Sequence, residues 1–299
     1  MSHLKLKPLK KGDPVAVAAP SGPFDRQQFL KGVGELQKVG FRVGFQKNIF
    51  ARHKVLKFLA GDDARRASEL NRYLSDDSKA ILFARGGFGC QRILPLLKGP
   101  CSPKVVVGLS DVTVLLNHLW QKFRLPSLYG PMVAPHLTEP HNVRRLVLAL
   151  TRSDALRKQD LPARAVIRSG QAQGTLVGGC LSLVASTLGT PWEIETKNTI
   201  LFLEDTDEQP YATDRLLLQL EQAGKFKGVR GIVFGTFRQG KILFPKEIKQ
   251  VIQERFKKFK GPVLWGLRFG HCPNPLFIPL GGVGRIQGKK LFIEQGIFE

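Results

Sequence analysis

The sequence predicts an α/β protein of two domains: a parallel sheet covered by helices, then an α+β domain with a strand-rich end. Three observations predict this. Short apolar runs alternate with amphipathic segments through residues 1–150, a polar and basic linker occupies 151–170, and residues 171–299 mix strand-like and helical runs. Alternating strands and helices are typical of a parallel sheet with right-handed crossovers. A chain of 299 residues also exceeds what one small core usually organises.

The first strand and helix form the clearest pair. The stretch "PVAVAAP" (14–20) is short, apolar and made of small residues, as a buried strand would be. Asp25 can cap the next helix, and Gly40 stands where that helix should stop. Apolar residues three or four apart mark the buried face of this helix: Phe29, Val33, Leu36 and Val39.

Three more strand–helix pairs complete the expected N-terminal sheet. The strands are expected at 41–45, 79–84 and 104–108, and the helices within 61–78, 90–98 and 112–123. In the helix of 61–78, Ala67, Leu70 and Leu74 share one face. Sites in such sheets form beyond the carboxyl ends of the strands.

The second domain is expected to combine long strands with two helices. Strand-like runs occupy 198–205, 228–237, 262–271 and a glycine-rich segment at 277–298, and helical runs occupy 214–224 and 246–259.

Composition narrows the class of protein. No run of eighteen apolar residues occurs, which argues against a membrane span, and "MSHLKLKPLKKGD" lacks the apolar centre of a secretory signal, so a cytoplasmic location is expected. The four cysteines are scattered without a Cys-x-x-Cys pair, which argues against a zinc ribbon, a thioredoxin-type motif or a disulfide framework.

The net charge of +22 indicates either a solvated basic surface or a specific anionic partner. No zinc-finger or RNA-recognition signature is present.

The stretch "VVVGLSDVTVLL" (105–116) places a serine and an aspartate between a buried strand and a helix. A serine on such a turn can act as a nucleophile, with the helix N-terminus favouring developing negative charge. The pattern is not G-x-S-x-G, because Val112 occupies the last glycine position. Ser110 or Asp111 could instead simply cap the helix, or Asp111 could cap it while Ser110 reacts.

A serine nucleophile needs a base and an orienting acid. Among the six histidines, His271 follows a strand in "RFGHCPNP", although a structural loop role suits it equally well. The strand-like "ILFLED" delivers Glu204 and Asp205 to the end of a buried element, where paired carboxylates are costly without a purpose. The run "EDTDE" also allows a magnesium or calcium site, but no calcium-loop pattern supports one.

The glycine-rich turn "ARGGFG" (84–89) follows another strand of the same sheet. Its backbone N–H groups can serve an oxyanion or a phosphate. It is neither a Walker loop nor G-x-G-x-x-G, since Arg92 stands where the third glycine would be, so it does not predict a dinucleotide site.

Six stretches, in this order along the chain, resemble the LD-carboxypeptidase family, the serine peptidases of murein recycling, and their microcin-immunity relatives. They are "VAAPSGP", "ARGGFG", "GLSDVT", "LVGGCLSLVASTLGTPW", "LFLEDTDEQPYATDRLLLQL" and "FGHCPNPLFIPLG". The resemblance covers nearly the whole chain. It implies a Rossmann-like N-terminal domain and a C-terminal domain with a β-barrel-like sheet.

The resemblance also implies a catalytic machinery and a substrate. The family's catalytic serine, glutamate and histidine fall on Ser110, Glu204 and His271. The implied reaction passes through an acyl-enzyme and releases terminal D-alanine from a muropeptide tetrapeptide, after a diamino acid. No metal or cofactor is required, no nucleic acid partner is expected, and family relatives imply a homodimer.

The oxyanion donors that the resemblance implies are the backbone N–H of Asp111 and that of Gly86 or Gly87. The chain departs from the family where Phe88 and Leu109 replace a frequent tyrosine and Cys180 a frequent asparagine, which puts substrate detail in doubt. Two other functions stay open: cleavage of an amide-linked peptide–nucleotide toxin by the same triad, and non-catalytic binding of anionic fragments or nucleic acid.

Overall fold

The chain divides into two compact units. One comprises Met1–Ala155 with Ile297–Glu299, and the other comprises Leu156–Gly296. The computed structural model describes residues 6–298, so that His3 and the rest of the first five residues lie outside the described part, as does Glu299.

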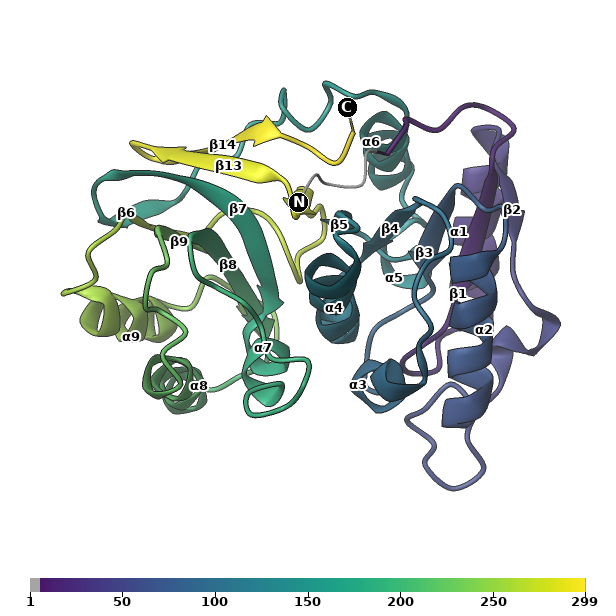
Figure 1. Cartoon of the computed structure of the whole chain (residues 1–299), viewed down its shortest axis with the longest axis horizontal. Helices are drawn as coiled ribbons and strands as arrows, with labels where there is room; N and C mark the ends of the chain where they lie inside the picture. Colours follow the sequence, from purple (N-terminus) through teal and green to yellow (C-terminus); the bar gives the residue numbers. More distant parts are fainter. Residues whose placement is uncertain (1–5, 299) are drawn as a thin grey trace. The chain divides into compact units, whose positions relative to one another are not determined.

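Unit 1 contains a parallel sheet (Figure 1). Its strands pair in the order β5-β4-β3-β1-β2. Their bounds are β1 Pro14–Ala18, β2 Arg42–Gly44, β3 Ala80–Phe83, β4 Val105–Gly108 and β5 Ser127–Tyr129. The residues of β3, β4 and β5 are all buried, and burial on both faces explains why β3 and β4 are continuous apolar runs.

Helices cover both faces of this sheet. Their bounds are α1 Arg26–Lys38, α2 Asp63–Ser75, α3 Cys90–Ile93, α4 Thr113–Phe123, α5 Val133–His136 and α6 Pro140–Thr151, with short 3₁₀ turns η1 Lys47–Phe50, η2 Leu94–Leu96 and η3 Ser110–Val112. On one face α1 packs against α5 and α6; on the other α2 packs against α3, and α3 against α4. This arrangement confirms the expected α/β class.

The first helix forms for the reasons its sequence indicates. The Asp25 carboxylate accepts a hydrogen bond from the backbone N–H of Gln28 at 2.8 Å, which satisfies a donor at the helix start. Gly40 has φ +101°, the left-handed conformation that ends helices. Phe29, Val33 and Leu36 are buried, whereas Val39, which follows the last helical residue, is 37% exposed.

Unit 2 contains a mixed, strongly curved sheet in the order β14-β13-β7-β8-β9-β11-β6, with β10 paired to β9. The bounds are β6 Ala165–Arg168, β7 Gln171–Cys180, β8 Thr199–Thr206, β9 Gly231–Gln239, β10 Ile242–Leu243, β11 Val263–Trp265, β13 Val283–Gln287 and β14 Lys290–Gln295. A further short strand of unit 2, β12 Ile278–Leu280, is not part of this sheet. The four strands β7, β8, β9 and β11 are parallel, and β13, β14 and β6 pair antiparallel.

The two edges of this sheet are brought together by backbone hydrogen bonds. The N–H of Ala163, just before β6, donates to the carbonyl of Lys289 at 2.9 Å, and the N–H of Leu291 donates to Leu161 at 3.1 Å. The sheet therefore curls into a half-barrel, and strand edges that would otherwise expose unpaired groups are covered. β6 itself lies within the range expected to be a linker.

Three helices accompany the half-barrel in the described part of unit 2: α7 Leu181–Ser186, α8 Pro210–Gln222 and α9 Lys246–Phe256. α8 packs against both α7 and α9. The buried aromatic rings of Phe234, Phe256 and Trp265 pack between α9 and the sheet.

Some elements of unit 1 were not predicted. The short strand β5 and the helices α5 and α6 lie in 127–151, a range for which no strand or helix was predicted. His136 ends α5 and His141 lies in the first turn of α6, where Pro140 is tolerated because its missing N–H costs nothing.

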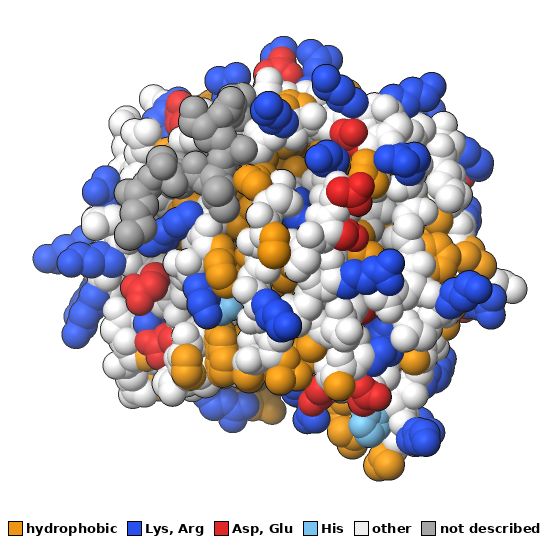
Figure 2. All heavy atoms as spheres, turned by 45° about the vertical axis from the view of Figure 1, so that its right-hand side comes forward, with side chains coloured by type: hydrophobic (Ala, Val, Ile, Leu, Met, Phe, Trp, Pro, Cys, Tyr) orange, Lys and Arg blue, Asp and Glu red, His pale blue; other side chains and the backbone are white. Residues whose placement is uncertain are grey.

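The basic side chains do not gather in one patch on the face that Figure 2 shows. On the face shown in Figure 2, Lys and Arg side chains are scattered, with Asp and Glu between them. Among residues 6–298, no helix has the length and apolar character required to cross a bilayer.

Candidate active site

Ser110 lies on a strained turn at the carboxyl end of β4. Leu109 is still extended, with φ −146° and ψ 180°, and Ser110, the first residue of η3, then adopts φ +69° ahead of α4. A positive φ is unfavourable for a residue with a Cβ, by about 1–3 kcal/mol. The Ser110 N–H donates to the hydroxyl of Tyr129 at 3.2 Å, on the neighbouring strand β5. The strand–turn–helix geometry is that of a nucleophile elbow.

This strain predicts an unusual order of stability for variants at position 110. Ser110→Gly should be more resistant to urea than Ser110→Ala, by about 0.5–1 kcal/mol in unfolding free energy, because glycine adopts φ +69° without a Cβ penalty. Ser68, exposed within α2, is the control: there glycine should be less stable than alanine, by about 1 kcal/mol. The same order at both positions would contradict a strained Ser110.

The glycine turn after β3 packs directly against Ser110. A Cβ on Gly86 would lie 2.7 Å from the Cβ of Ser110 and 2.8 Å from its Oγ, so only glycine fits there. Gly87 has φ +112° and contacts Gly22, whose N–H donates to the carbonyl of Gly86 at 3.0 Å. The amide of Asp111 lies 3.4 Å from the same Cβ position of Gly86. The structure thus brings the expected oxyanion donors and Ser110 together.

The side chain of Asp111 does not cap α4, contrary to one expectation. Its Oδ2 accepts a hydrogen bond from the backbone N–H of Cys90, the first residue of α3, at 2.8 Å. The carboxyl group is buried, and burial raises its pKa. Asp111 therefore ties the turn that carries Ser110 to the end of the glycine turn.

Arg66 and Glu69 hold the loops around this turn. The Arg66 guanidinium is fully buried and donates to the carbonyls of Pro20 and Gly89. Glu69 accepts the N–H of Ala19 at 2.8 Å, and burial raises its pKa. The sequence analysis missed both residues. The sequence feature that could have indicated them is the presence of charged residues on the apolar face of α2, beside Ala67 and Leu70.

Glu204 and His271 form a tight pair in unit 2. Glu204 is fully buried near the end of β8, and its Oε2 lies 2.7 Å from the His271 Nδ1 and accepts the His271 backbone N–H at 2.9 Å. A carboxylate at Nδ1 holds a proton on that nitrogen and leaves Nε2 as the basic atom of the neutral ring. The pairing fixes the His271 ring by its Nδ1 and leaves Nε2 as the ring nitrogen that can accept a proton.

Gly270 makes this pairing possible. It has φ +89°, and a Cβ there would lie 2.3 Å from both Cγ and Oε2 of Glu204. The backbone must come this close for one carboxylate oxygen to accept both donors of His271. The Gly-His order in the sequence is therefore a requirement of packing around Glu204.

Two opposing effects determine the pKa of His271. Burial lowers the pKa of the imidazole, but the adjacent Glu204 carboxylate raises it, and the net pKa lies above the ordinary value. The carboxylate therefore stabilises the imidazolium that forms when His271 accepts a proton.

Asp205, the second carboxylate of "ILFLED", has a different environment. Its oxygens accept the backbone N–H groups of Ser182 and Thr206, each at 2.8 Å, and the Cys180 thiol at 3.2 Å. Burial and, to a smaller extent, the Glu204 charge raise the pKa of Asp205 to about 6. Asp205 thus links β8 to the start of α7.

The raised pKa of Asp205 predicts a pH dependence of stability. Between pH 4 and about 6 the folded state holds a proton that the unfolded state releases, so stability falls by roughly 3 kcal/mol as pH rises through this window. Asp205→Asn should be less stable overall, because its NH₂ group faces a backbone donor, but should lack this decline. Urea unfolding at several pH values measures the slopes, with the exposed Asp160→Asn as a control that keeps the wild-type slope. If the unfolding free energies of wild type and Asp205→Asn fell in parallel as pH rises, the raised pKa of Asp205 would be contradicted.

Asp207, a third carboxylate of the run "EDTDE", has a structural role. Asp207 accepts the N–H of Gly240 at 2.8 Å and so holds the turn between β9 and β10. Among residues 6–298, no three His, Cys, Asp or Glu side chains gather as a metal site would require. All four cysteines are free thiols.

Comparison with known proteins places this chain in a family. Residues 15–130 match the LD-carboxypeptidase N-terminal domain, and residues 173–286 match the LD-carboxypeptidase C-terminal domain. A probable murein peptide carboxypeptidase of Bacillus subtilis is 33% identical over 99% of this chain and 96% of its own length. The chain belongs to the LD-carboxypeptidase family. The resemblance seen in the sequence motifs is thereby confirmed.

Solved structures confirm the fold of this LD-carboxypeptidase family member. The wild-type microcin C7 self-immunity protein MccF superposes with a TM-score of 0.85 at 24% identity, covering 99% of this chain and 100% of that one. A muramoyltetrapeptide carboxypeptidase from Oxalobacter formigenes superposes with a TM-score of 0.80 at 25% identity, covering 95% of this chain and 99% of that one.

Proposed function

We propose that this chain is a metal-independent serine carboxypeptidase that removes the terminal D-amino acid from muropeptide tetrapeptides, with Ser110, His271 and Glu204 as its catalytic triad. The observation that carries the proposal is the buried Glu204 carboxylate, which accepts both the Nδ1 proton and the backbone N–H of His271. The relatives named as murein peptide and muramoyltetrapeptide carboxypeptidases support the substrate class.

The proposed reaction begins with proton transfer. His271 Nε2 takes the proton of the Ser110 hydroxyl as its oxygen attacks the scissile carbonyl carbon. Glu204 stabilises the resulting imidazolium, since its carboxylate already raises the pKa of His271. The imidazolium then gives its proton to the leaving amine, and the D-amino acid departs.

Two backbone donors would stabilise the tetrahedral oxyanion. The N–H of Asp111 is the first, and the N–H of Gly86 or Gly87 is the second, because the glycine turn lies against Ser110. Removing one such donor costs about 3 kcal/mol in a serine protease of known mechanism. Water then attacks the acyl-enzyme with His271 again as base, which releases the tripeptide and restores Ser110.

A side-by-side assay tests this proposal. The purified protein is incubated with a tetrapeptide that ends in a diamino acid and D-alanine, and with a peptide joined to a nucleotide by an amide-type linkage. Release of D-alanine from the first, measured by mass spectrometry, is expected. Cleavage of the second substrate alone would instead support the immunity-type activity, and binding without cleavage of either would support a non-catalytic role.

The proposed enzyme acts in the cytoplasm, on muropeptides returned from the wall, and works as a homodimer. Membership of the LD-carboxypeptidase family supports this setting. Cell fractionation and light scattering of the purified protein test the location and the subunit number separately.

A further inference from the structure

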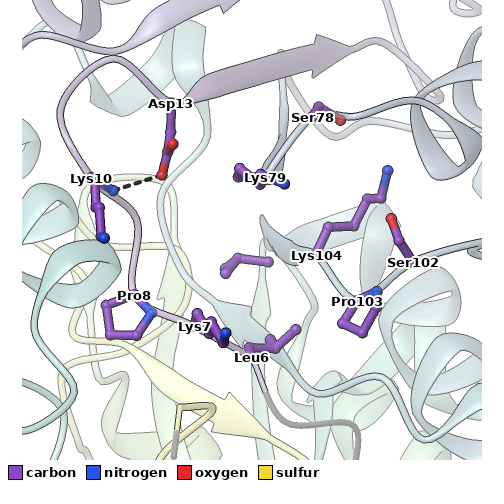
Figure 3. A pocket seen from close by; sticks show the side chains of 11 residues that line it. Leu6, Lys7, Pro8, Lys10, Asp13, Ser78, Lys79, Ser102, Pro103 and Lys104 are labelled. Carbon is purple, nitrogen blue, oxygen red and sulfur yellow. Dashed lines mark hydrogen bonds between the residues drawn. The ribbon is translucent and has the colours of Figure 1, made fainter.

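A cavity of about 480 Å³ lies at the amino ends of the unit 1 strands (Figure 3). Three segments line it: the chain before β1, the residues before β3, and the residues before β4. The lining side chains are Leu6, Lys7, Pro8, Lys10, Asp13, Ser78, Lys79, Ser102, Pro103, Lys104 and Val105. Ser110 follows the other end of β4, about 15 Å away along the strand. The cavity and the nucleophile turn therefore occupy opposite edges of one sheet.

The charge around this cavity is strongly positive. Lys7, Lys10 and Lys79 are exposed, and within residues 6–298 their ammonium groups form no ion pair or hydrogen bond. The acidic side chain among the lining residues is Asp13, whose Oδ2 accepts the backbone N–H of Lys10 at 2.7 Å. Several like charges around one hollow repel each other, and an anion inside it would relieve that repulsion.

Lys104 has a different role from the three exposed lysines. Its ammonium group donates to the carbonyls of Tyr73 and Asp76, at 2.7 and 2.8 Å, and lies 3.6 Å from the Asp76 carboxylate. Lys104 therefore holds the cavity wall between α2 and β4 in place. The ammonium groups available to bind an anionic ligand are those of the three exposed lysines.

The remaining lining favours a small organic molecule over a bare ion. Leu6, Pro8, Pro103 and Val105 form apolar walls, and the exposed Ser102 adds a hydroxyl group. A volume of about 480 Å³ falls in the range of small-molecule sites. Lysine ammonium groups are compact point charges that bind phosphate oxygens without a required planar geometry.

We propose that this lysine-lined cavity, formed by Lys7, Lys10 and Lys79 over apolar walls, binds a small phosphate ester, at a site distinct from the one that carries Ser110. The three ammonium groups surround the phosphate, Ser102 donates to one of its oxygens, and the organic part rests on Pro8, Pro103 and Val105. The site goes beyond the proposed peptidase reaction and does not depend on it.

Calorimetric titration tests the site with three probes: ATP, inorganic pyrophosphate and citrate. ATP carries a phosphate ester with an organic part, pyrophosphate carries the phosphates alone, and citrate carries a similar charge on carboxylates. We expect the wild-type protein to bind ATP most tightly, pyrophosphate more weakly and citrate least. Citrate binding as tight as that of ATP would overturn the phosphate assignment, and absence of binding by any probe would overturn the site.

Matched variants separate the cavity from general surface charge. The triple substitution Lys7→Gln, Lys10→Gln and Lys79→Gln should weaken ATP binding by at least about tenfold. The same change of charge at the exposed Lys31, Lys47 and Lys98, which lie outside the cavity, should leave the affinity within about twofold of wild type. Equal losses in both triples would show non-specific attraction and overturn the proposal.

A second variant tests the cavity without removing lysines. Ser102→Glu places a carboxylate at the rim, where Ser102 is exposed, and should also weaken ATP binding by at least about tenfold. Wild-type affinity in this variant would contradict the proposed position of the phosphate. D-alanine release should be unchanged in all cavity variants, because the lining residues lie at the opposite edge of the sheet from Ser110.

Discussion

Ser110→Ala should abolish D-alanine release while leaving the fold intact. Loss of the hydroxyl removes the atom that attacks the carbonyl, and loss of a nucleophile in a serine protease costs roughly 10⁶-fold in turnover. Alanine keeps the Cβ and meets the same constraint at φ +69°, so unfolding free energy should stay within about 0.5 kcal/mol of wild type. Mass spectrometry of the product and urea unfolding measure the two effects.

The control for this experiment is Ser68→Ala, in which an exposed helical serine of the same unit is changed. It should retain full activity. A serine-directed phosphonate should label wild type and Ser68→Ala but not Ser110→Ala. Turnover by Ser110→Ala above about a thousandth of the wild-type rate would remove Ser110 from the nucleophile role.

Glu204→Gln should lower turnover by roughly 10²–10⁴-fold and shift the pH profile. The same Oε2 accepts both donors of His271, so a glutamine oxygen in that place can keep both hydrogen bonds and the ring orientation. What the variant loses is the charge. With the raising effect gone and burial still present, the pKa of His271 should fall, and the acid limb of kcat/KM should move to lower pH.

The pH dependence of the unfolding free energy should show the loss of the Glu204 charge independently of activity. A raised folded pKa means that protonated His271 stabilises the wild-type fold at low pH, and this contribution is lost as pH rises through the folded pKa. Glu204→Gln should lack that contribution. Glu193→Gln changes a carboxylate that pairs with Lys225 elsewhere in unit 2, and it should leave the acid limb of activity unchanged. An acid limb that stays in place in Glu204→Gln would contradict the role given to the carboxylate.

Much of the architecture could be predicted because local patterns and tertiary packing agree. Each of the strands β1, β3 and β4 is a short apolar run, and the cap at Asp25 and the stop at Gly40 lie where the sequence indicates. The strand β5 was missed because it is only three residues long, too short for any periodicity. Its place is decided by pairing with β4.

The candidate site likewise contains residues that the sequence predicted and residues that it did not. Ser110, Glu204 and His271 could be chosen from strand ends and motif order, because carboxyl ends of strands are where side chains gather above a sheet. Arg66 and Glu69 were missed although their charges lie on the apolar face of α2. The groups they hold near the site are backbone groups of Pro20, Gly89 and Ala19, up to 50 residues away. A hydrogen bond to a distant carbonyl leaves no sequence spacing to recognise.

The sequence by itself determined which residue types follow each strand, and hence the candidate chemistry. The tertiary structure decided how those residues are used. In the folded chain the Asp111 carboxylate accepts the amide of Cys90 instead of capping a helix. Glu204 and Asp205 are adjacent in sequence but bind different partners: Glu204 binds His271, and Asp205 binds Ser182. The physical reason is alternation: neighbouring residues of a strand point to opposite faces, so which distant donors each carboxylate meets depends on what packs against each face.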